Sequence, residues 1–427
     1  MSAAAGDITA PAATDRRPVT AVLIANAVSL TGDALAAVAI PWFVLETTGS
    51  AAKAGLSGGV AVLPAFVAGI FGGTLIDRLG PKRASVVADV VGGLAVLLIP
   101  LLYATVGLAF WQLLVLILLG GVLDLPGVTA RRGMLPELAR LGGVRLEQVN
   151  ALLEGNQQLS YLLGPPIAGI AIGLVGADRV LWADAATFAL SAAVIAKLVP
   201  PRLYPAHRRE AGTGYLDELR VGLRFLWDDR ILRAGSLALA ATNAVGGPVF
   251  SVVAIVYARD RFASATYAGL FLSALGLGSW LGTMAYGASL HRFSRRWIWA
   301  VAYLCYPLEI WMFAFRWPVA AMLGVLFLAG LIGGAVNPLF VTVRMERIPP
   351  ALRGRVFATS SAIAMAAQPA GIAVGGVMVQ ALGLRPTVVV LAVAAQAIGL
   401  IIFLQPVWKG LDDTRPDLAT AEEQHQA

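Results

Sequence analysis

The sequence predicts an all-α membrane protein in which twelve transmembrane helices form two pseudo-symmetric six-helix bundles. Three observations lead to this prediction: an apolar composition, apolar runs long enough to span a membrane, and motifs that recur half a chain apart. Hydrophobic residues make up 58% of the 427 residues, charged residues make up 13%, and the mean hydropathy is +0.77. These values exclude a soluble globular domain.

Apolar runs of about 20 residues, the length that a helix needs to cross a bilayer, recur along the whole chain. We place the twelve spans at residues 19–45, 54–76, 84–105, 108–130, 150–174, 179–199, 232–257, 265–290, 297–315, 318–342, 357–381 and 385–405. The first run is too long for the core of a signal peptide, so we expect it to be a retained helix. The predicted domains are a cytoplasmic tail (1–18), an N-terminal bundle (19–199), a linker (200–231), a C-terminal bundle (232–405) and a polar, disordered cytoplasmic tail (406–427).

Three motifs of the first half return in order in the second half, at offsets of 213–217 residues. The pairs are 26–28 with 243–245, 73–83 with 287–296, and 129–131 with 342–344. Both copies of the second motif end an apolar run and begin a basic loop. A duplicated membrane protein with one such loop in each half is typical of transporters built from two similar bundles.

The basic balance, a net charge of +7, follows the predicted topology. With both termini placed in the cytoplasm, only six of the 32 Lys and Arg residues fall in external segments: Lys53, Arg179, Arg259, Arg261, Arg316 and Arg385. This asymmetry obeys the positive-inside rule and indicates a plasma membrane protein with both termini inside. The charge therefore does not predict a nucleic-acid partner. The single Cys305 and three scattered histidines predict no disulfide and no metal site.

The linker between the two halves contains an amphipathic helix. Leucines recur at positions 216, 219, 223 and 226, with charged residues between them. This spacing predicts a helix that lies on the membrane surface or against the bundle. We expect it to brace the two halves; a binding module is the alternative.

The loop between the second and third spans resembles the signature loop of the major facilitator superfamily. It reads Gly-x-Leu-x-Asp-Arg-x-Gly-x-Lys-Arg, from Gly73 to Arg83. The stretches 130–138, 218–226 and 352–356 resemble the group that contains macrolide-efflux proteins, an enterobactin exporter and multidrug exporters of actinobacteria. The resemblance covers nearly the whole chain. It implies a bacterial inner-membrane exporter driven by protons.

The signature loop is expected to act as a gate. Two glycines in such a loop permit close helix contact and a tight turn, and an acid at a helix end can meet a cation or a helix N-terminus. The resemblance implies a charge-locked latch that must break for the transporter to open inward; ordinary topogenic charge is the alternative. We assign Gly73, Asp77, Arg78, Gly80, Lys82, Arg83 and, from helix four, Arg131 to this gating loop.

Acids inside the membrane are the candidates for proton coupling, because an embedded carboxylate is costly and therefore a functional candidate. Asp33 lies near the middle of the first helix and shares a face with Asn26. In the superfamily, helices one, four, seven and ten line the cavity. Burial favours the protonated form of such an acid near neutral pH. A structural hydrogen bond is the alternative role.

Two further acids are coupling candidates. Asp124 lies in helix four, where Pro126 and Gly127 predict a bend, and a helix-end role is its alternative. Glu309 lies in helix nine, which is peripheral in the superfamily. Asp89 and Asp184 lie near helix ends and are expected to be interfacial or paired.

Helix five carries Gly164, Pro165 and Gly169 at the spacing of the superfamily's antiporter motif, with Ser160 and Ala168 in place of two glycines. Generic packing of small residues is the alternative role for this stretch. Mid-helix polar and aromatic residues complete the predicted substrate cavity: Asn26, Asn243, Phe250, Asn337, Phe340 and Gln368. Lipid contact or packing is the alternative for the two aromatic residues.

The predicted function is proton-coupled efflux of drugs or other amphiphilic small molecules by alternating access. The expected partners are the small substrate, protons and the lipid bilayer, the expected state is a monomer, and the energy source is the proton gradient with no cofactor. A dedicated siderophore or metabolite exporter and an uptake symporter on the same fold are alternatives. A membrane sensor or enzyme is a remote one, because the sequence has no clustered nucleophile, metal-ligand set or phosphate-binding loop.

Overall fold

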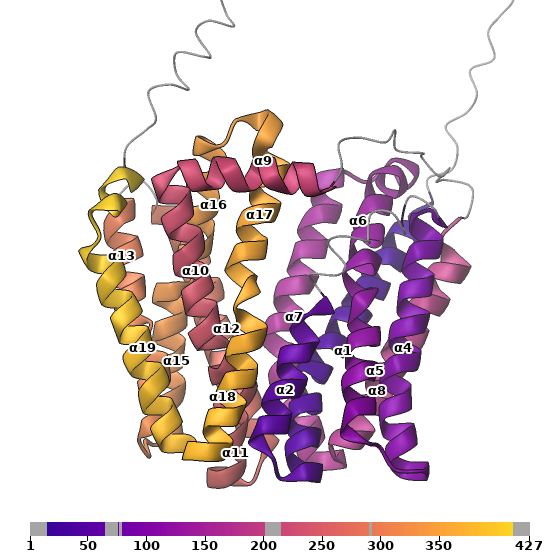
Figure 1. Ribbon diagram of the computed structural model, residues 1–427. Helices are drawn as coiled ribbons and strands as arrows, with labels where there is room; N and C mark the ends of the chain where they lie inside the picture. The colour runs from indigo at the N-terminus through magenta and orange to yellow at the C-terminus, as the bar shows by residue number, and fades with distance from the viewer. Residues whose placement is uncertain (1–14, 65–75, 77–78, 201–214, 290–292, 413–427) are drawn as a thin grey trace, which may run out of the picture.

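The computed structural model describes residues 15–64, 76, 79–200, 215–289 and 293–412. These residues are nearly all helical, and they form two bundles that stand side by side, with helices α1 to α8 in one and α10 to α19 in the other (Figure 1). Eleven described helices are long and apolar enough to cross a membrane. The second predicted span is described only in its first half, as α2, and the rest lies outside the described residues.

The N-terminal bundle contains α1 (Arg17–Thr48), α2 (Ala51–Val62), α4 (Pro81–Thr105), α5 (Phe110–Val122), α6 (Asp124–Leu141), α7 (Leu146–Val175) and α8 (Ala177–Leu198). Helix α9 (Tyr215–Asp228) follows the linker. The C-terminal bundle contains α10 (Arg230–Pro248), the π-helical turn η2 (Val249–Val253), α11 (Ala254–Phe262), α12 (Ala265–Ser289), α13 (Arg295–Cys305), α14 (Leu308–Trp311), η3 (Met312–Ala314), α15 (Val319–Gly333), α16 (Val336–Arg347), η4 (Pro350–Leu352), α17 (Arg353–Ala366), α18 (Gln368–Leu382), α19 (Leu384–Leu404) and η5 (Pro406–Leu411).

Several spans consist of two helices with a local break between them. The α5–α6 break lies at Leu123, close to Pro126 and Gly127, as the sequence predicts. The α17–α18 break lies at Ala367, two residues before Pro369. Proline removes a backbone donor and glycine loosens the helix, so both residue types place bends where a span must change direction.

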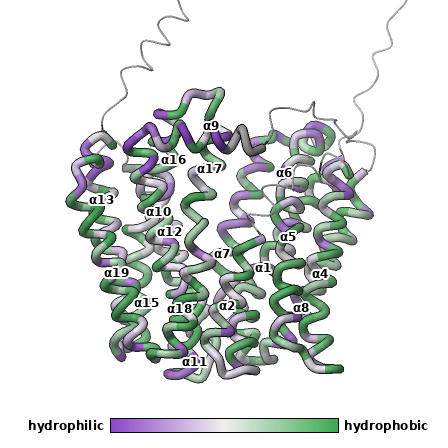
Figure 2. The backbone as a smooth tube through the Cα atoms, viewed as in Figure 1, coloured by the Kyte–Doolittle hydropathy of each residue, from purple (hydrophilic) through white to green (hydrophobic). Residues whose placement is uncertain are grey.

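The molecule has a basic side and a far side. We call the end that carries the start of α1, α9 and η5 the basic side, which is at the top of Figure 1. Hydrophobic residues cover the length of the bundles, whereas hydrophilic residues gather at the basic side and along α9 (Figure 2). This banding is what a bilayer requires of a spanning protein.

The apolar core is shared by both bundles at the far side and divided at the basic side. The largest buried cluster joins residues of the first bundle, such as Phe43 and Leu181, to residues of the second, such as Val253 and Phe271. At the basic side, one cluster around Met134 belongs to the first bundle alone, and two clusters around Phe340 and Leu226 belong to the second. The structure is therefore closed at the far side.

Glycines permit this closure because they let two backbones touch. A Cβ added to Gly55 of α2 would lie 2.7 Å from the Cα of Gly376 in α18. The backbone N–H of Ala51 donates a hydrogen bond of 3.0 Å to Oε1 of Gln380 across the same contact. On the other flank, a Cβ added to Gly269 of α12 would lie 2.2 Å from the carbonyl oxygen of Pro165 in α7. Small residues allow such close helix packing inside a membrane.

Helix α9 forms as predicted, and its Leu226 is buried with Leu232 and Val356 of the C-terminal bundle. That it braces the two halves stays a prediction. The expectation of a disordered tail is wrong for residues 406–411. The tail begins with η5, whose Trp408 is only 2% exposed and packs on Trp299 at a ring distance of 5.1 Å. An indole ring on an otherwise polar tail buries enough apolar surface to order the segment around it.

A side chain at Gly55 should prevent closure of the far side. We expect Gly55→Leu to reduce transport at least tenfold while the protein stays folded, because each bundle keeps its own core at the basic side and overpacking costs about 1–3 kcal/mol. The measurement is labelling of Ser251→Cys by a membrane-impermeant maleimide from the far side, in a Cys305→Ser background. Labelling should rise when Gly55→Leu is added.

Gly324→Leu is the matched control, because no atom lies within 4 Å of a Cβ added there. Unchanged labelling and unchanged transport in Gly55→Leu would contradict the assigned role of the glycine contact.

Candidate functional site

Three neighbouring cavities lie inside the closed molecule and share lining residues. The central cavity, of about 680 Å³, lies between the bundles and is lined by α1, α6 and α7 on one side and by η2 and α12 on the other. The acidic cavity, of about 320 Å³, lies among α1, α2, α4, α5, α6, α8 and η2. The C-terminal cavity, of about 370 Å³, lies among α10, α13, α15 and α18. A cavity that draws its lining from both bundles is the place where a bound substrate can sense their relative movement.

The acidic cavity brings together three carboxylates. Asp33 and Asp124 line both this cavity and the central cavity. Asp184 lines the acidic cavity as well, although the sequence predicts an interfacial or paired residue. Its side chain is fully buried, Thr187 donates to Oδ1 at 3.4 Å, and Oδ2 has no hydrogen-bond partner among the described residues. The rest of this wall is mostly apolar.

Within the described ranges, no group of three or more His, Cys, Asp or Glu side chains is arranged to hold a metal ion. Three carboxylates that line one cavity can exchange protons. Their mutual repulsion in an apolar surrounding disfavours the state in which all three are ionised.

Arg131 forms a buried ion pair in the core of the first bundle. Its Nη1 donates to Oδ1 of Asp89 at 2.8 Å, and its Nη2 donates to the Ser29 hydroxyl at 3.3 Å. Ser191 donates to the other oxygen of Asp89 at 2.6 Å. The network joins α6, α4, α1 and α8. The pairing of Asp89 is as expected. The described contacts of Arg131 lie inside the bundle, and its assignment to the gating loop stays a prediction, because Asp77 and Arg78 lie outside the described residues.

The duplicated position in the second bundle, Arg344, has a different environment. It is also buried, and its guanidinium lies 5.0 Å from the ring centre of Phe340 and 4.4 Å from that of Phe357. Nη1 donates to the Ser360 hydroxyl at 3.4 Å, and no described carboxylate is within ion-pair distance. Aromatic faces stabilise this cation in place of an acid. The two bundles therefore share a buried arginine and differ in its counter-charge.

Only part of the signature loop is described. Gly80 has a φ of 74°, a left-handed conformation that favours glycine, and α4 begins directly after it. Lys82 Nζ donates to the carbonyl oxygens of Ala196 and Val199 at 2.8 and 2.5 Å, at the C-terminal end of α8. This lysine therefore caps a helix whose end carries a partial negative charge. Arg83 is exposed.

Gly73, Asp77 and Arg78 lie outside the described residues, so the latch stays a prediction.

The C-terminal cavity collects the remaining polar candidates. Asn243, Phe250, Glu309 and Gln368 all line it. Glu309 reaches the cavity although its helix was expected to be peripheral, because α13 ends at Cys305 and a break at Pro307 separates it from α14.

The same break places Tyr306 in the wall of the cavity, where its hydroxyl donates to the Thr242 carbonyl at 2.9 Å. Sequence reasoning missed Tyr306, and the neighbouring proline was the available signal.

The antiporter-like stretch of α7 lies on the seam between the bundles. A Cβ on Gly164 would lie 2.2 Å from Cβ of Ala34 in α1, and a Cβ on Gly169 would lie 2.6 Å from the carbonyl oxygen of Ala265 in α12. Thr266 donates to the carbonyl of Gly169 at 3.2 Å. The small residues thus let α7 pack on both bundles at once.

The other cavity candidates divide into two groups. Asn26 and Phe250 line the central cavity. Asn337 is exposed and is not among the residues that line the three cavities. For Phe340 the alternative role, packing, holds in place of the cavity assignment: its ring is fully buried against Trp299, in space that Gly235 leaves open.

Comparison with known proteins agrees with the geometry. Residues 22–260 match the family model of the Major Facilitator Superfamily, which is more than half of the chain. The chain belongs to the Major Facilitator Superfamily. As a member of this superfamily, it is a multi-pass membrane transporter and not an enzyme.

Relatives within the superfamily match nearly the full length. The multidrug efflux pump Tap of Mycobacterium tuberculosis is 31% identical over 401 residues, which cover 93% of this chain and 96% of that protein. The enterobactin exporter EntS of Citrobacter koseri is 28% identical over 402 residues, covering 90% and 89%. Among solved structures, the nucleoside transporter NupG superposes with a TM-score of 0.72 at 13% identity, covering 90% of this chain and 98% of that one, which shows the shared fold.

Loss of the Asp89 charge should destabilise the first bundle. We expect Asp89→Asn to lower the free energy of unfolding by about 3–5 kcal/mol, because Arg131 then stays buried without a counter-charge. The measurement is thermal unfolding of the purified protein in detergent. The double variant Asp89→Leu/Arg131→Met should recover most of the loss, since it leaves no unpaired charge.

Arg140→Gln is the control, because it removes an exposed ion pair with Glu137 and should leave the melting temperature unchanged. A double variant as unstable as Asp89→Asn would contradict the interpretation.

Proposed function

We propose that this transporter exports cationic amphiphilic small molecules in exchange for protons, by alternating access of its central cavity. The observation that carries the proposal is the set of three carboxylates, Asp33, Asp124 and Asp184, on one cavity wall. Two of them also border the central cavity between the bundles. A carboxylate in that position can bind either a proton or a cation, which is the exclusive choice that antiport requires.

The charge balance of the central cavity favours a cationic substrate. Arg132 also lines the cavity, but its Nη2 lies 3.0 Å from Oε1 of Glu154 and donates to Oε1 of Gln157 at 2.8 Å. Its charge is therefore countered from within the wall. The acids at 33 and 124 have no described ion-pair partner. The charge of Arg131 acts on both of them but is already paired with Asp89, so the charge left for a ligand is negative. Apolar and aromatic surface from Tyr161, Phe250 and Leu272 suits the body of an amphiphile.

The bundles are in contact at the far side and their cores are separate at the basic side. This arrangement supports the half of an alternating-access cycle in which the far side is closed. In the proposed cycle the glycine contact between α2 and α18 opens while the basic side closes. Inward movement of one proton supplies about 2.3 kcal/mol per 100 mV of membrane potential, and the pH gradient adds to it. No cofactor is required. The proposed topology has both termini in the cytoplasm of a bacterial inner membrane, and the proposed unit is a monomer.

The relatives support export over uptake. The similarity to a multidrug efflux pump covers nearly the full chain and favours drugs as substrates. The similarity to an enterobactin exporter favours a second candidate, a dedicated siderophore exporter. The two candidates differ in the charge of the substrate, and the acidic wall favours the first.

Asp33→Asn should abolish proton-coupled export. Purified protein in proteoliposomes, with a pH dye inside and an imposed pH gradient, is tested with cationic dyes, macrolides, tetracyclines and a catecholate siderophore. We expect at least one cationic compound to release protons from wild-type vesicles, and the release rate to fall at least tenfold in Asp33→Asn, because an amide cannot exchange a proton. Binding of the cationic compound, read from a shift in thermal stability, should weaken as well, because the amide carries no negative charge.

Asp260→Asn is the control, since this exposed acid is remote from the three cavities. Wild-type export with an unchanged pH dependence in Asp33→Asn would exclude coupling through this residue. Proton release by the siderophore alone would favour the dedicated exporter.

Glu309 should set the preference for charge in the C-terminal cavity. We expect Glu309→Gln to weaken binding of a cationic substrate about tenfold, equivalent to about 1.4 kcal/mol, and to leave a neutral analogue of similar shape unaffected. Binding is measured by quenching of tryptophan fluorescence. Glu46→Gln, at the exposed end of α1, serves as the control. Equal losses for the charged and neutral ligands would indicate a structural role for Glu309 instead.

A further inference from the structure

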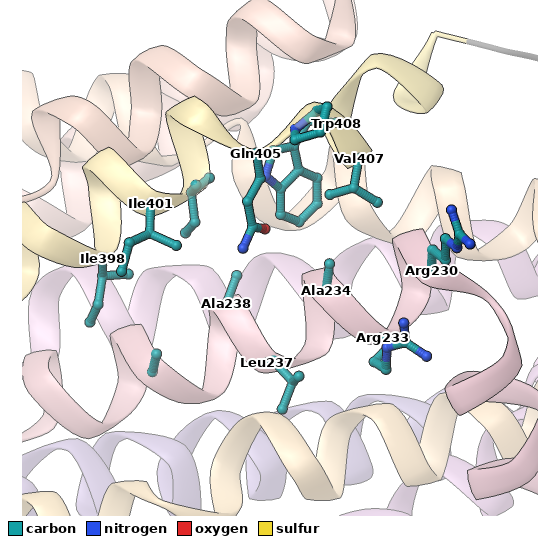
Figure 3. Close-up of a pocket in the computed structure, with 13 residues that line it drawn as sticks. Arg230, Arg233, Ala234, Leu237, Ala238, Ile398, Ile401, Gln405, Val407 and Trp408 are labelled. Atoms are coloured by element: carbon teal, nitrogen blue, oxygen red, sulfur yellow. The ribbon is translucent and has the colours of Figure 1, made fainter.

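An apolar groove lies on the outside of the C-terminal bundle, separate from the three cavities. It is formed by α10, α19 and η5 at the basic side and has a volume of about 480 Å³. Ala234 and Ala238 form its floor, Ile398 and Ile401 lie at one end, and Arg230 and Arg233 lie together at the other end (Figure 3). The groove shares no lining residue with the cavities of the transport site.

The two arginines form a positive end to this groove. They occupy the first turn of α10. The nearest acid in sequence, Asp229, is already engaged: its Oδ1 accepts from the N–H groups of Ile231 and Leu232, and its Oδ2 pairs with Arg347 at 3.2 Å.

No described carboxylate lies within ion-pair distance of Arg230 or Arg233. Arg233 donates to the carbonyl of Trp227, which leaves its positive charge without an acidic partner. The groove end is thus positively charged and available to an anion.

The surroundings of the groove show that a membrane covers it. Leu237 and Ile401 line the groove and are 45% and 55% exposed, and Leu404 beside it is 74% exposed. Large apolar side chains at this exposure lie on a spanning helix only where lipid tails cover them. Arginines at the end of such a span extend to the level of the lipid headgroups.

The wall of the groove also contains a buried donor without a described partner. Trp408 of η5 lines the groove, is 2% exposed, and its Nε1 has no hydrogen-bond partner among the described residues. Buried indole N–H groups usually have an acceptor. A ligand with acceptor oxygens at the groove mouth could supply one.

We propose that this groove binds one anionic phospholipid, with the phosphate on Arg230 and Arg233 and an acyl chain along α10 and α19. From Ala234 to Ala241 the floor is about 10 Å long at 1.5 Å per residue, enough for roughly half of an acyl chain. A soluble anion would satisfy the arginines but leave the apolar floor empty. A zwitterionic lipid would fill the floor but carry no net charge to the arginines. An anionic lipid matches both parts of the groove.

The bound lipid would connect the transport site to the membrane. The groove floor is α10, and the opposite surface of the same helix carries Asn243 in the C-terminal cavity. η5 is held over the groove by the contact of Trp408 with Trp299 and by a hydrogen bond from Arg347 to the Gly410 carbonyl at 2.9 Å. A lipid in the groove therefore contacts three elements of one bundle and none of the other.

The experiment is native mass spectrometry of the full-length protein, released from detergent with phosphatidylglycerol, phosphatidylcholine or inorganic phosphate. The wild type should retain one phosphatidylglycerol that Arg230→Gln/Arg233→Gln binds about thirtyfold more weakly, since each arginine near an anionic headgroup contributes about a factor of five. Lys409→Gln is the matched control, because this exposed lysine on η5 does not line the groove. It should retain the lipid as the wild type does.

Ala234→Phe tests the apolar part independently of charge, because its ring would fill the floor of the groove. It should lose the same lipid while both arginines remain. The proposal is overturned if the double arginine variant or Ala234→Phe binds phosphatidylglycerol as the wild type does. It is also overturned if phosphatidylcholine is retained equally well, or if inorganic phosphate displaces the lipid. Thermal unfolding without added lipid confirms that each variant is folded.

Discussion

Backbone contact between the two bundles at the far side is the constraint on which the rest of the structure depends. Gly55 against Gly376 and Gly269 against Pro165 bring helices of opposite bundles closer than any side chain would allow. Because the bundles meet there, their apolar cores merge at one end and separate at the other. The cavities lie just beyond the merged core. Their position and the direction in which they face follow from where glycine is placed along α2, α12 and α18.

Much of the fold could be predicted from the sequence, because the features involved are local or repeat along the chain. The lengths of the apolar runs predicted the spans, and the repeats half a chain apart predicted the two bundles. A glycine before Pro81 predicted the turn that Gly80 makes, and Pro126 with Gly127 predicted the break in the fourth span. Asp33, Asp124 and Glu309 could be named because an acid in an apolar run is conspicuous by itself.

The remaining features depend on contacts between distant segments. Asp184 joins the acidic wall because α8 packs on α1, which no local pattern reveals. Phe340 lies in the core because Trp408, from a segment predicted to be disordered, and Trp299 close over that side of the bundle. Arg344 occupies the position equivalent to Arg131, but two aromatic rings contact its guanidinium in place of a carboxylate. In each case, the partner that decides the role comes from another helix.

The π-helical turn η2 has a consequence for movement within a span. Phe250 borders the central and C-terminal cavities, and Ser251 borders the C-terminal and acidic cavities, so this one turn touches all three. A π turn contains one more residue than an α turn, and such turns occur frequently at functional sites. The position of the extra residue can shift along the helix while both ends of the span stay in place. A shift of one position rotates a side chain by about 100° about the helix axis. Such a rotation would move the Phe250 ring between the cavities that surround η2.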